Sequence, residues 1–218
     1  MKRWGRPLAW LLGLVLLLSS WSSAPVMAAP TQEAVLAGGC FWCLEHDLEV
    51  VPGVLAVESG YSGGSLEHPT YGQVSSGRTG HQEAVLVRFD PSRLSYGDLL
   101  RSYWRNIDPL DGGGQFCDRG SSYSPMIFAR GDQQRGQAQA SLRAAAAELG
   151  LPVGALKVRI QPLKRFWPAE SYHQEYAVRN RLKYNYYRWA CGRDRRLEAV
   201  WGPRARSGKA WTVPAGKN

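Results

Sequence analysis

Residues 33–50 have the sequence EAVLAGGCFWCLEHDLEV, which predicts a strand, a glycine turn and a helix in direct succession. The first five residues form a short apolar run typical of a strand, and two glycines end it. Beyond the glycines, apolar residues recur at helical spacing. They are Phe41, Leu44, Leu48 and Val51. Cys40 is therefore expected in the first turn of the helix.

The position of Cys40 favours a reactive thiolate. Backbone N–H groups at the start of a helix point toward a side chain placed there, and the positive end of the helix dipole lowers the pKa of a thiol. A buried, inert cysteine is the alternative, because free cysteine is among the most buried residue types.

The spacing Cys40-x-x-Cys43 leaves two other kinds of site to consider. A zinc site would need a second ligand pair at similar spacing, but Cys117 and Cys191 are isolated in the sequence. A thioredoxin-like disulfide oxidoreductase stays open as an alternative, because a Cys-x-x-Cys pair at a helix start suits that activity.

The remaining sequence predicts a single α+β domain. Strands are predicted over 54–61, 84–89, 126–129 and 158–162. Helices are predicted over 95–104 and 132–149, and partly over 171–188. Residues 108–124 form a long glycine-rich loop, and a loop of this length is usually functional or disordered. Because strands alternate with helices, we expect a two-layer α/β sandwich with a mixed sheet.

The first 28 residues predict a secretory signal peptide. A basic start precedes an apolar run over 8–18, and small residues lead to a cleavage site after Ala28. The run is shorter than the ~20 residues of a spanning helix. We expect export, with a periplasmic or extracellular mature protein that is not inserted in a membrane. Retention of the segment as a membrane anchor is the alternative.

The charge distribution predicts a basic tail. The formal net charge is +9, and residues 29–218 carry +6 of it because Lys2, Arg3 and Arg6 precede them. Residues 203–218 are rich in Pro, Gly, Arg and Lys, which predicts a disordered tail after a folded domain over 29–202. A basic tail can bind nucleic acid. Export would remove nucleic acid from reach, so we expect no such partner, and we expect a monomer.

Five motifs follow one another along the chain: GGCFWCLE at 38–45, GYSGG at 60–64, PTY at 69–71, GHQEAV at 80–85 and DRGSSY at 118–123. Together they resemble the peptide methionine sulfoxide reductase A family, over about residues 33–176. The resemblance implies an α+β sandwich with a ferredoxin-like core and reduction of methionine (S)-sulfoxide in proteins, peptides or the free amino acid. It implies no bound metal, flavin or nicotinamide.

The resemblance also implies roles at the start of the helix. Cys40 matches the family's nucleophile, which attacks the sulfur of methionine sulfoxide. Phe41 and Trp42 are similar to the aromatic pair that holds the substrate methyl group.

A sulfoxide sulfur is a poor electrophile until its oxygen accepts a proton or strong hydrogen bonds. Glu83 matches the family's catalytic acid, and a carboxylic acid can donate near pH 7 only if burial keeps it neutral. Tyr71 and Tyr123 match the hydroxyls that bind the sulfoxide oxygen, as neutral donors aimed at developing charge. Asp118 matches a further acid of the site.

In the family the nucleophile is left as a sulfenic acid, and a second thiol condenses with it to a disulfide. Cys43 is near Cys40 by sequence, whereas Cys191 would need its segment to fold over the site. We favour Cys43 as the recycling cysteine, with Cys191 nearly as well supported and Cys117 as a third candidate. The implied external reductant is a dithiol protein of thioredoxin type.

Overall fold

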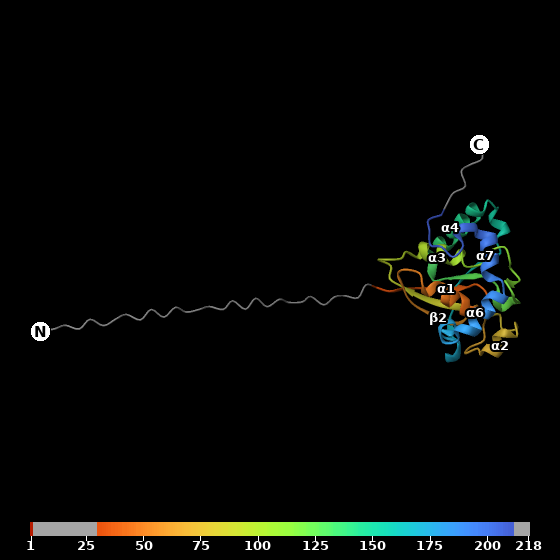
Figure 1. The fold of residues 1–218 in the computed structure, drawn as a ribbon, viewed down its shortest axis with the longest axis horizontal. Coiled ribbons are helices and arrows are strands. Elements are labelled where there is room, and N and C mark those ends of the chain that lie inside the picture. The colour runs from red at the N-terminus through yellow and green to blue at the C-terminus, as the bar shows by residue number, and fades with distance from the viewer. Residues whose placement is uncertain (2–29, 212–218) are drawn as a thin grey trace, which may run out of the picture.

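A computed structural model describes Met1 and residues 30–211 of the chain (Figure 1). The predicted signal peptide, apart from Met1, and residues 212–218 of the predicted tail lie outside the described residues. Within the described part, no helix has the length and apolar character that crossing a membrane requires.

Six strands form one sheet in the order β7-β6-β1-β3-β2-β8. Their bounds are β1 Gln32–Ala37, β2 Val54–Ser62, β3 Gln82–Phe89, β6 Met126–Ala129, β7 Arg159–Pro162 and β8 Phe166–Pro168. Neighbours run antiparallel except β6 and β7, which are parallel. The predicted mixed sheet of an α+β protein is confirmed. The sequence did not predict β8, because three residues are too few to show a period.

The α-helices are α1 Phe41–Glu49, α2 Tyr71–Ser75, α3 Tyr96–Trp104, α4 Gly131–Leu149, α5 Tyr176–Arg179, α6 Arg181–Ala190 and α7 Arg193–Trp201. Short 3-10 helices are η1 Ser121–Tyr123, η2 Val153–Ala155, η3 Ser171–His173 and η4 Gly202–Arg204. The three helices predicted in full are confirmed as α1, α3 and α4. In Figure 1, α4 and α7 lie toward one end of the domain and α2 and α6 toward the other, with α1 between them.

The main hydrophobic core lies between one face of the sheet and helices α1, α3 and α4. Leu44 of α1, Trp104 of α3 and Ala145 of α4 are fully buried in it. Successive strand residues point to opposite faces of a sheet. Leu36 of β1 therefore belongs to this core, while Val35 belongs to a smaller cluster on the other face. The packing fixes α1, and with it the position of Cys40, against the sheet.

The turn between β1 and α1 needs its two glycines. Gly39 has a φ of +83°, and a Cβ at this position would lie 2.6 Å from the Cβ of Gln115. A Cβ on Gly38 would lie 2.6 Å from the Cγ2 of Ile107. Any side chain at either position would displace a neighbouring segment. The close turn brings Cys40 to the N-cap position of α1.

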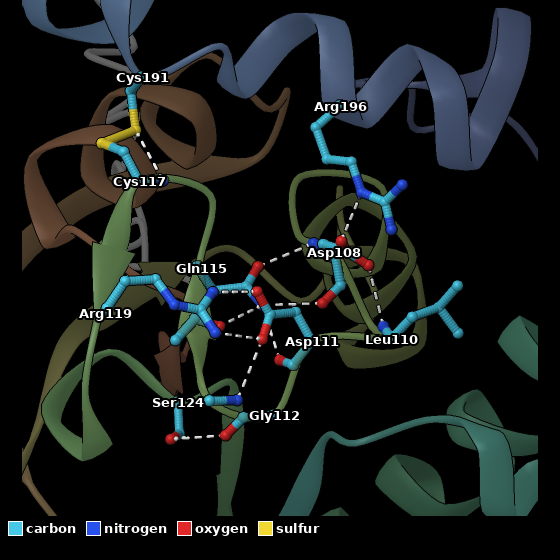
Figure 2. Close-up of polar contacts among 12 residues, drawn as sticks. Asp108, Leu110, Asp111, Gly112, Gln115, Cys117, Arg119, Ser124, Cys191 and Arg196 are labelled. Carbon is cyan, nitrogen blue, oxygen red and sulfur yellow. Dashed lines mark hydrogen bonds and ion pairs between the residues drawn. A yellow bond between two sulfur atoms is a disulfide. The ribbon is translucent and has the colours of Figure 1, made fainter.

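The loop predicted over 108–124 contains the short hairpin β4 Gly114–Gln115 and β5 Asp118–Arg119, followed by η1. The buried amide of Gln115 organises it (Figure 2). Its Oε1 accepts a hydrogen bond from the Asp108 N–H at 2.8 Å, and its Nε2 donates to the carbonyl oxygens of Asp108 and Asp111. The loop is therefore an ordered part of the site rather than a disordered connection.

The prediction of disorder from residue 203 is wrong for residues 203–211. The fully buried guanidinium of Arg105 donates to the carbonyl oxygens of Ser207 and Ala210, and it lies 5.2 Å from the ring centroid of Trp211. Composition predicted a solvated tail. A buried guanidinium needs acceptors, however, and the tail backbone supplies them.

Candidate active site

Cys40 and Cys43 are both buried at the start of α1, and neither forms a disulfide. Backbone N–H groups of Cys43 and Leu44 donate to the carbonyl oxygen of Cys40, at 3.1 and 3.3 Å, as expected at a helix start. The interaction between the two thiols raises the pKa of Cys40 and lowers that of Cys43. The two thiols are therefore close neighbours.

The protonation of Cys40 differs from the expected thiolate. Burial raises the pKa of the Cys40 thiol well above its ordinary value, and the interaction with Cys43 raises it further. The carboxyl groups of Glu83 and Asp118 act in the same direction. The helix dipole favours a thiolate, but here it is opposed by burial and by two nearby acids.

Glu83 lies on β3, the strand that pairs with β1. β1 and β3 are antiparallel neighbours, with Leu36 opposite Val85. The last residues of β1 and the first residues of β3 therefore lie side by side at the same end of the sheet. Glu83 is 2% exposed, and its Oε2 accepts a hydrogen bond of 3.0 Å from the Phe41 N–H. Burial raises the pKa of Glu83 to about 8, although the Phe41 N–H lowers it in part. This carboxyl group is largely protonated at pH 7.

Two phenols adjoin this acid. Tyr71 is the first residue of α2 and Tyr123 the last of η1. The Tyr123 hydroxyl lies close enough to lower the pKa of both Tyr71 and Glu83. Burial raises the pKa of both phenols, so both remain neutral donors. The structure thus brings together Tyr71, Tyr123 and Glu83 from three separate segments.

Asp118 lies in β5, and its carboxyl group accepts a hydrogen bond from α6. The hydroxyl of Tyr187, on α6, donates to its Oδ2 at 2.6 Å. Burial raises the pKa of Asp118, while the Tyr187 hydroxyl lowers it in part. The charge of Asp118 also raises the pKa of Glu83.

The aromatic pair after Cys40 is fixed by residues near the end of the chain. The indole of Trp42 stacks on Tyr176, with ring centroids 3.6 Å apart and an angle of 6° between the planes. Its Nε1–H donates to the Nδ1 of His173 at 3.0 Å. Phe41 is buried, 4.9 Å from the His173 ring and 6.5 Å from that of Tyr71. These rings form an apolar wall beside Cys40.

Four residues that support this arrangement were not predicted from the sequence: Glu170, His173, Tyr176 and Tyr187. Glu170 accepts hydrogen bonds from the Tyr71 N–H at 2.9 Å and from the hydroxyl of Tyr61 at 2.8 Å. His173, Tyr176 and Tyr187 are described above. The aromatic-rich composition of 171–188 marked the segment but did not indicate that it packs against α1 and β5.

Cys191 and Cys117 are joined to each other by a disulfide, across 74 residues of sequence (Figure 2). In this state neither sulfur is free to react with Cys40, which differs from the expectation that Cys191 could be a recycling thiol. Cys43 is the free thiol that interacts with Cys40.

The fold and site define an α+β protein with a buried Cys-x-x-Cys pair at a helix start and a protonated carboxyl group beside it. Residues 32–205 match the family described as peptide methionine sulfoxide reductase. The chain belongs to this family.

Individual relatives resemble nearly the whole domain. Peptide methionine sulfoxide reductase MsrA 2 of Caulobacter vibrioides is 55% identical over 182 residues, which cover 83% of this chain and 91% of that protein. MsrA 2 of Rhizobium meliloti is 48% identical over 184 residues, covering 84% and 90%. The structure of methionine sulfoxide reductase A of Corynebacterium diphtheriae has a TM-score of 0.64 at 31% identity, over 70% of this chain and 76% of that one.

Proposed function

We propose that the protein reduces methionine sulfoxide to methionine, acting on the S epimer in proteins, peptides or the free amino acid. One observation carries the proposal: Glu83, buried and with a pKa of about 8, is hydrogen-bonded to the helix start that bears Cys40. A neutral acid beside a buried thiol can protonate the oxygen of a sulfoxide while the thiol attacks its sulfur. The names of similar relatives from Caulobacter vibrioides and Rhizobium meliloti agree with this activity.

The proposed reaction begins with the sulfoxide oxygen among the donors of the site. The Oε2 of Glu83 already accepts the Phe41 N–H, so Oε1 carries the acid proton. Tyr71 and Tyr123 donate hydrogen bonds to the same oxygen as negative charge develops on it. The Cys40 sulfur attacks the sulfoxide sulfur and forms an S–S bond, its thiol proton and the Glu83 proton go to the oxygen, and the S–O bond breaks with release of water. Water then attacks the Cys40 sulfur and returns a proton to Glu83, the S–S bond breaks, methionine leaves, and Cys40 becomes a sulfenic acid.

The recycling step uses Cys43. Its sulfur attacks the Cys40 sulfenic acid, a disulfide forms, and the hydroxyl leaves as water. The interaction between the two thiols supports this choice. An external dithiol protein of thioredoxin type then reduces the disulfide by thiol exchange and is itself oxidised. The cycle needs no bound metal, flavin or nicotinamide.

The proposal includes export. The basic start and the apolar run over 8–18 support a cleaved signal peptide. The Cys117–Cys191 disulfide adds support, because such bonds persist mainly in oxidising compartments. The mature protein is then a periplasmic or extracellular monomer that repairs oxidised proteins. The mass of the protein recovered from the extracytoplasmic fraction tests this: an intact N-terminus would exclude cleavage.

In the sheet, the run β6-β1-β3-β2 is antiparallel, and α1 and α3 follow β1 and β3 in the chain. We assign this run as the ferredoxin-like core that the resemblance implies. The assignment explains why Cys40 and Glu83 are neighbours: Cys40 follows β1 and Glu83 lies at the start of the adjacent antiparallel strand β3, so both lie at the same end of the sheet.

The test uses the purified protein, dithiothreitol and a peptide carrying either epimer of methionine sulfoxide. Only the S epimer should be reduced. Cys40→Ser should abolish the reaction, and Glu83→Gln should slow it about 100-fold or more, the usual contribution of a general acid. Disulfide exchange without any methionine release would instead support a thioredoxin-like oxidoreductase that uses Cys40 and Cys43.

A further inference from the structure

The Cys117–Cys191 disulfide links two segments that both reach the site. Cys117 lies between β4 and β5, and Cys191 is the C-cap residue of α6. Their Cα atoms are 5.0 Å apart, and the Cys117 N–H also donates to the Cys191 sulfur at 3.1 Å. Cys117 is exposed and Cys191 half-buried, so the bond lies at the surface. The catalytic cycle proposed above does not use it.

The residues beside the disulfide contact each other within the site. Asp118 directly follows Cys117, and Tyr187 lies one helical turn before Cys191 on α6. The Tyr187 hydroxyl donates to Asp118 at 2.6 Å. The disulfide therefore ties together the two backbone segments whose side chains form this hydrogen bond.

Other contacts fix the loop itself: Gln115 pairs with Asp118 across the β4–β5 hairpin, and Arg119 forms an ion pair with Asp111, but neither contact joins β5 to α6. Arg196 of α7 bonds to Asp108 at 2.6 Å, and the Gln115 amide holds the first part of the loop (Figure 2). At the outer part, the Arg193 guanidinium lies 4.4 Å from the ring centroid of Phe116. Without the disulfide, the Tyr187 hydrogen bond would link β5 to α6, and the contacts of Arg193 and Arg196 would link the loop to α7 instead.

We propose that the Cys117–Cys191 disulfide is a positioning clamp that holds Asp118 at the active site and stays closed during turnover. The inference rests on the proposed function of Cys40 and Glu83. The clamp does not touch substrate, and it acts through Asp118. Opening it would need two electrons from a dithiol, which becomes a disulfide while Cys117 and Cys191 each gain a proton.

Because Asp118 is an acid, its position affects the pKa values of the groups around it. Asp118 raises the pKa of both Glu83 and Cys40. If Asp118 moved away, both pKa values would fall. The titratable groups facing Glu83 are Cys40 and Cys43 of α1, Tyr61 of β2, Tyr71 of α2, Asp118 of β5 and Tyr123 of η1. Only the position of Asp118 is changed directly by opening the clamp.

The test compares the wild-type protein with the Cys117→Ser/Cys191→Ser double variant. Methionine release is followed in a single turnover without reductant, after mass spectrometry has verified that Cys40 and Cys43 are free. The double variant should be about tenfold slower, a typical cost of a misplaced group. The alkaline limb of its pH–rate profile should move to lower pH. Asn185→Ala, on the exposed face of α6, is the control and should keep the wild-type rate.

An Asp118→Asn background separates the clamp from general stability. If the clamp acts through Asp118, removing the disulfide from the Asp118→Asn variant should lower the rate of methionine release less than about twofold. The reason is that the effects of two groups that act as one unit are not additive. A full tenfold loss in that background would overturn the proposal. So would an unchanged rate and profile in the double variant, or a Cys117–Cys191 bond that opens during the single turnover.

If the serine variant does not fold, the wild-type protein is measured before and after mild reduction of the exposed bond. The same loss of rate is expected, and an unchanged rate would overturn the clamp. Alkylation of Cys40 by iodoacetamide gives a readout that needs no sulfoxide. Its pH dependence should move to lower pH when the clamp is open. A wild-type protein that releases no methionine but shows this shift would refute the proposed function and retain the clamp.

Discussion

The N–H of Phe41 donates a hydrogen bond of 3.0 Å to the Oε2 of Glu83. This single bond connects the first turn of α1 to the first residues of β3, across 42 positions of sequence. It places a buried carboxyl group beside the thiol of Cys40, and the burial keeps that group protonated at neutral pH.

The first prediction concerns the pH dependence of turnover. Protonated Glu83 is the active form, so kcat/KM should fall as the pH rises through about 8. Glu83→Gln should lower kcat/KM about 100-fold and remove this limb from the profile. The measurement is kcat/KM of both proteins from about pH 5 to about pH 10. A wild-type rate that is flat across this range would contradict the assignment of Glu83.

The same carboxyl group predicts a change in stability with pH. Its folded pKa lies above its unfolded value, so the folded state binds the extra proton between those two values. The free energy of unfolding should therefore decrease as the pH rises toward 8. Glu83→Gln should lessen this decrease. Urea unfolding of both proteins at several pH values measures the difference, and parallel curves would contradict it.

Single-turnover experiments should distinguish the roles of Cys40 and Cys43. Without reductant, Cys43→Ser should release one equivalent of methionine and stop, with Cys40 oxidised. The wild-type protein should do the same but end with a Cys40–Cys43 disulfide, seen by mass spectrometry. A bond between Cys40 and Cys191 in either protein would show that another cysteine recycles Cys40.

The phenols should act as one unit. Tyr71→Phe and Tyr123→Phe should each lower kcat/KM about tenfold or more, since each removes a donor to the developing charge. Because the two hydroxyls are close neighbours whose pKa values are linked, the double variant should lose less than the product of the two effects. Steady-state kinetics of the three variants tests this, and a strictly multiplicative loss would indicate independent roles.

His173 should set the orientation of Trp42. It is buried and accepts the indole N–H, so His173→Leu leaves that donor without a partner, at a cost of about 1–3 kcal/mol. We expect a higher KM with a smaller change in kcat, because the indole wall loses its fixed position. His173→Gln keeps a polar acceptor and is the matched control. Equal KM values for Leu and Gln would count against the hydrogen bond.

The buried pair of Arg105 and Glu148 should affect stability without affecting chemistry. Both side chains are fully buried, and Arg105 also bonds to the backbone of residues 207–210. Arg105→Met should lower the free energy of unfolding by about 3–5 kcal/mol, because it breaks a buried pair. The rate of the folded variant should stay near wild type. Urea unfolding and kcat measured in parallel test both parts.

Local features of the sequence determined much of the molecule. The apolar periods over 84–89, 95–104 and 132–149 gave the strands and helices found there. Gly38 and Gly39 predicted the turn that brings Cys40 to the helix start, because a side chain would not fit at either position. The separate motifs also indicated the side chains that the structure gathers around Cys40. These signals are local, and each depends on residues a few positions apart.

The tertiary structure alone decided which distant groups meet and how they are charged. The contacts of Asp118 with Tyr187 and of Trp42 with His173 each join segments at least 69 residues apart, and no periodicity encodes such a pairing. The bond between Cys117 and Cys191 is one of six bonds that four cysteines could form. The protonation of Cys40 also reversed the expectation, because desolvation and nearby carboxyls depend on the complete packing around a group and outweigh the helix dipole there.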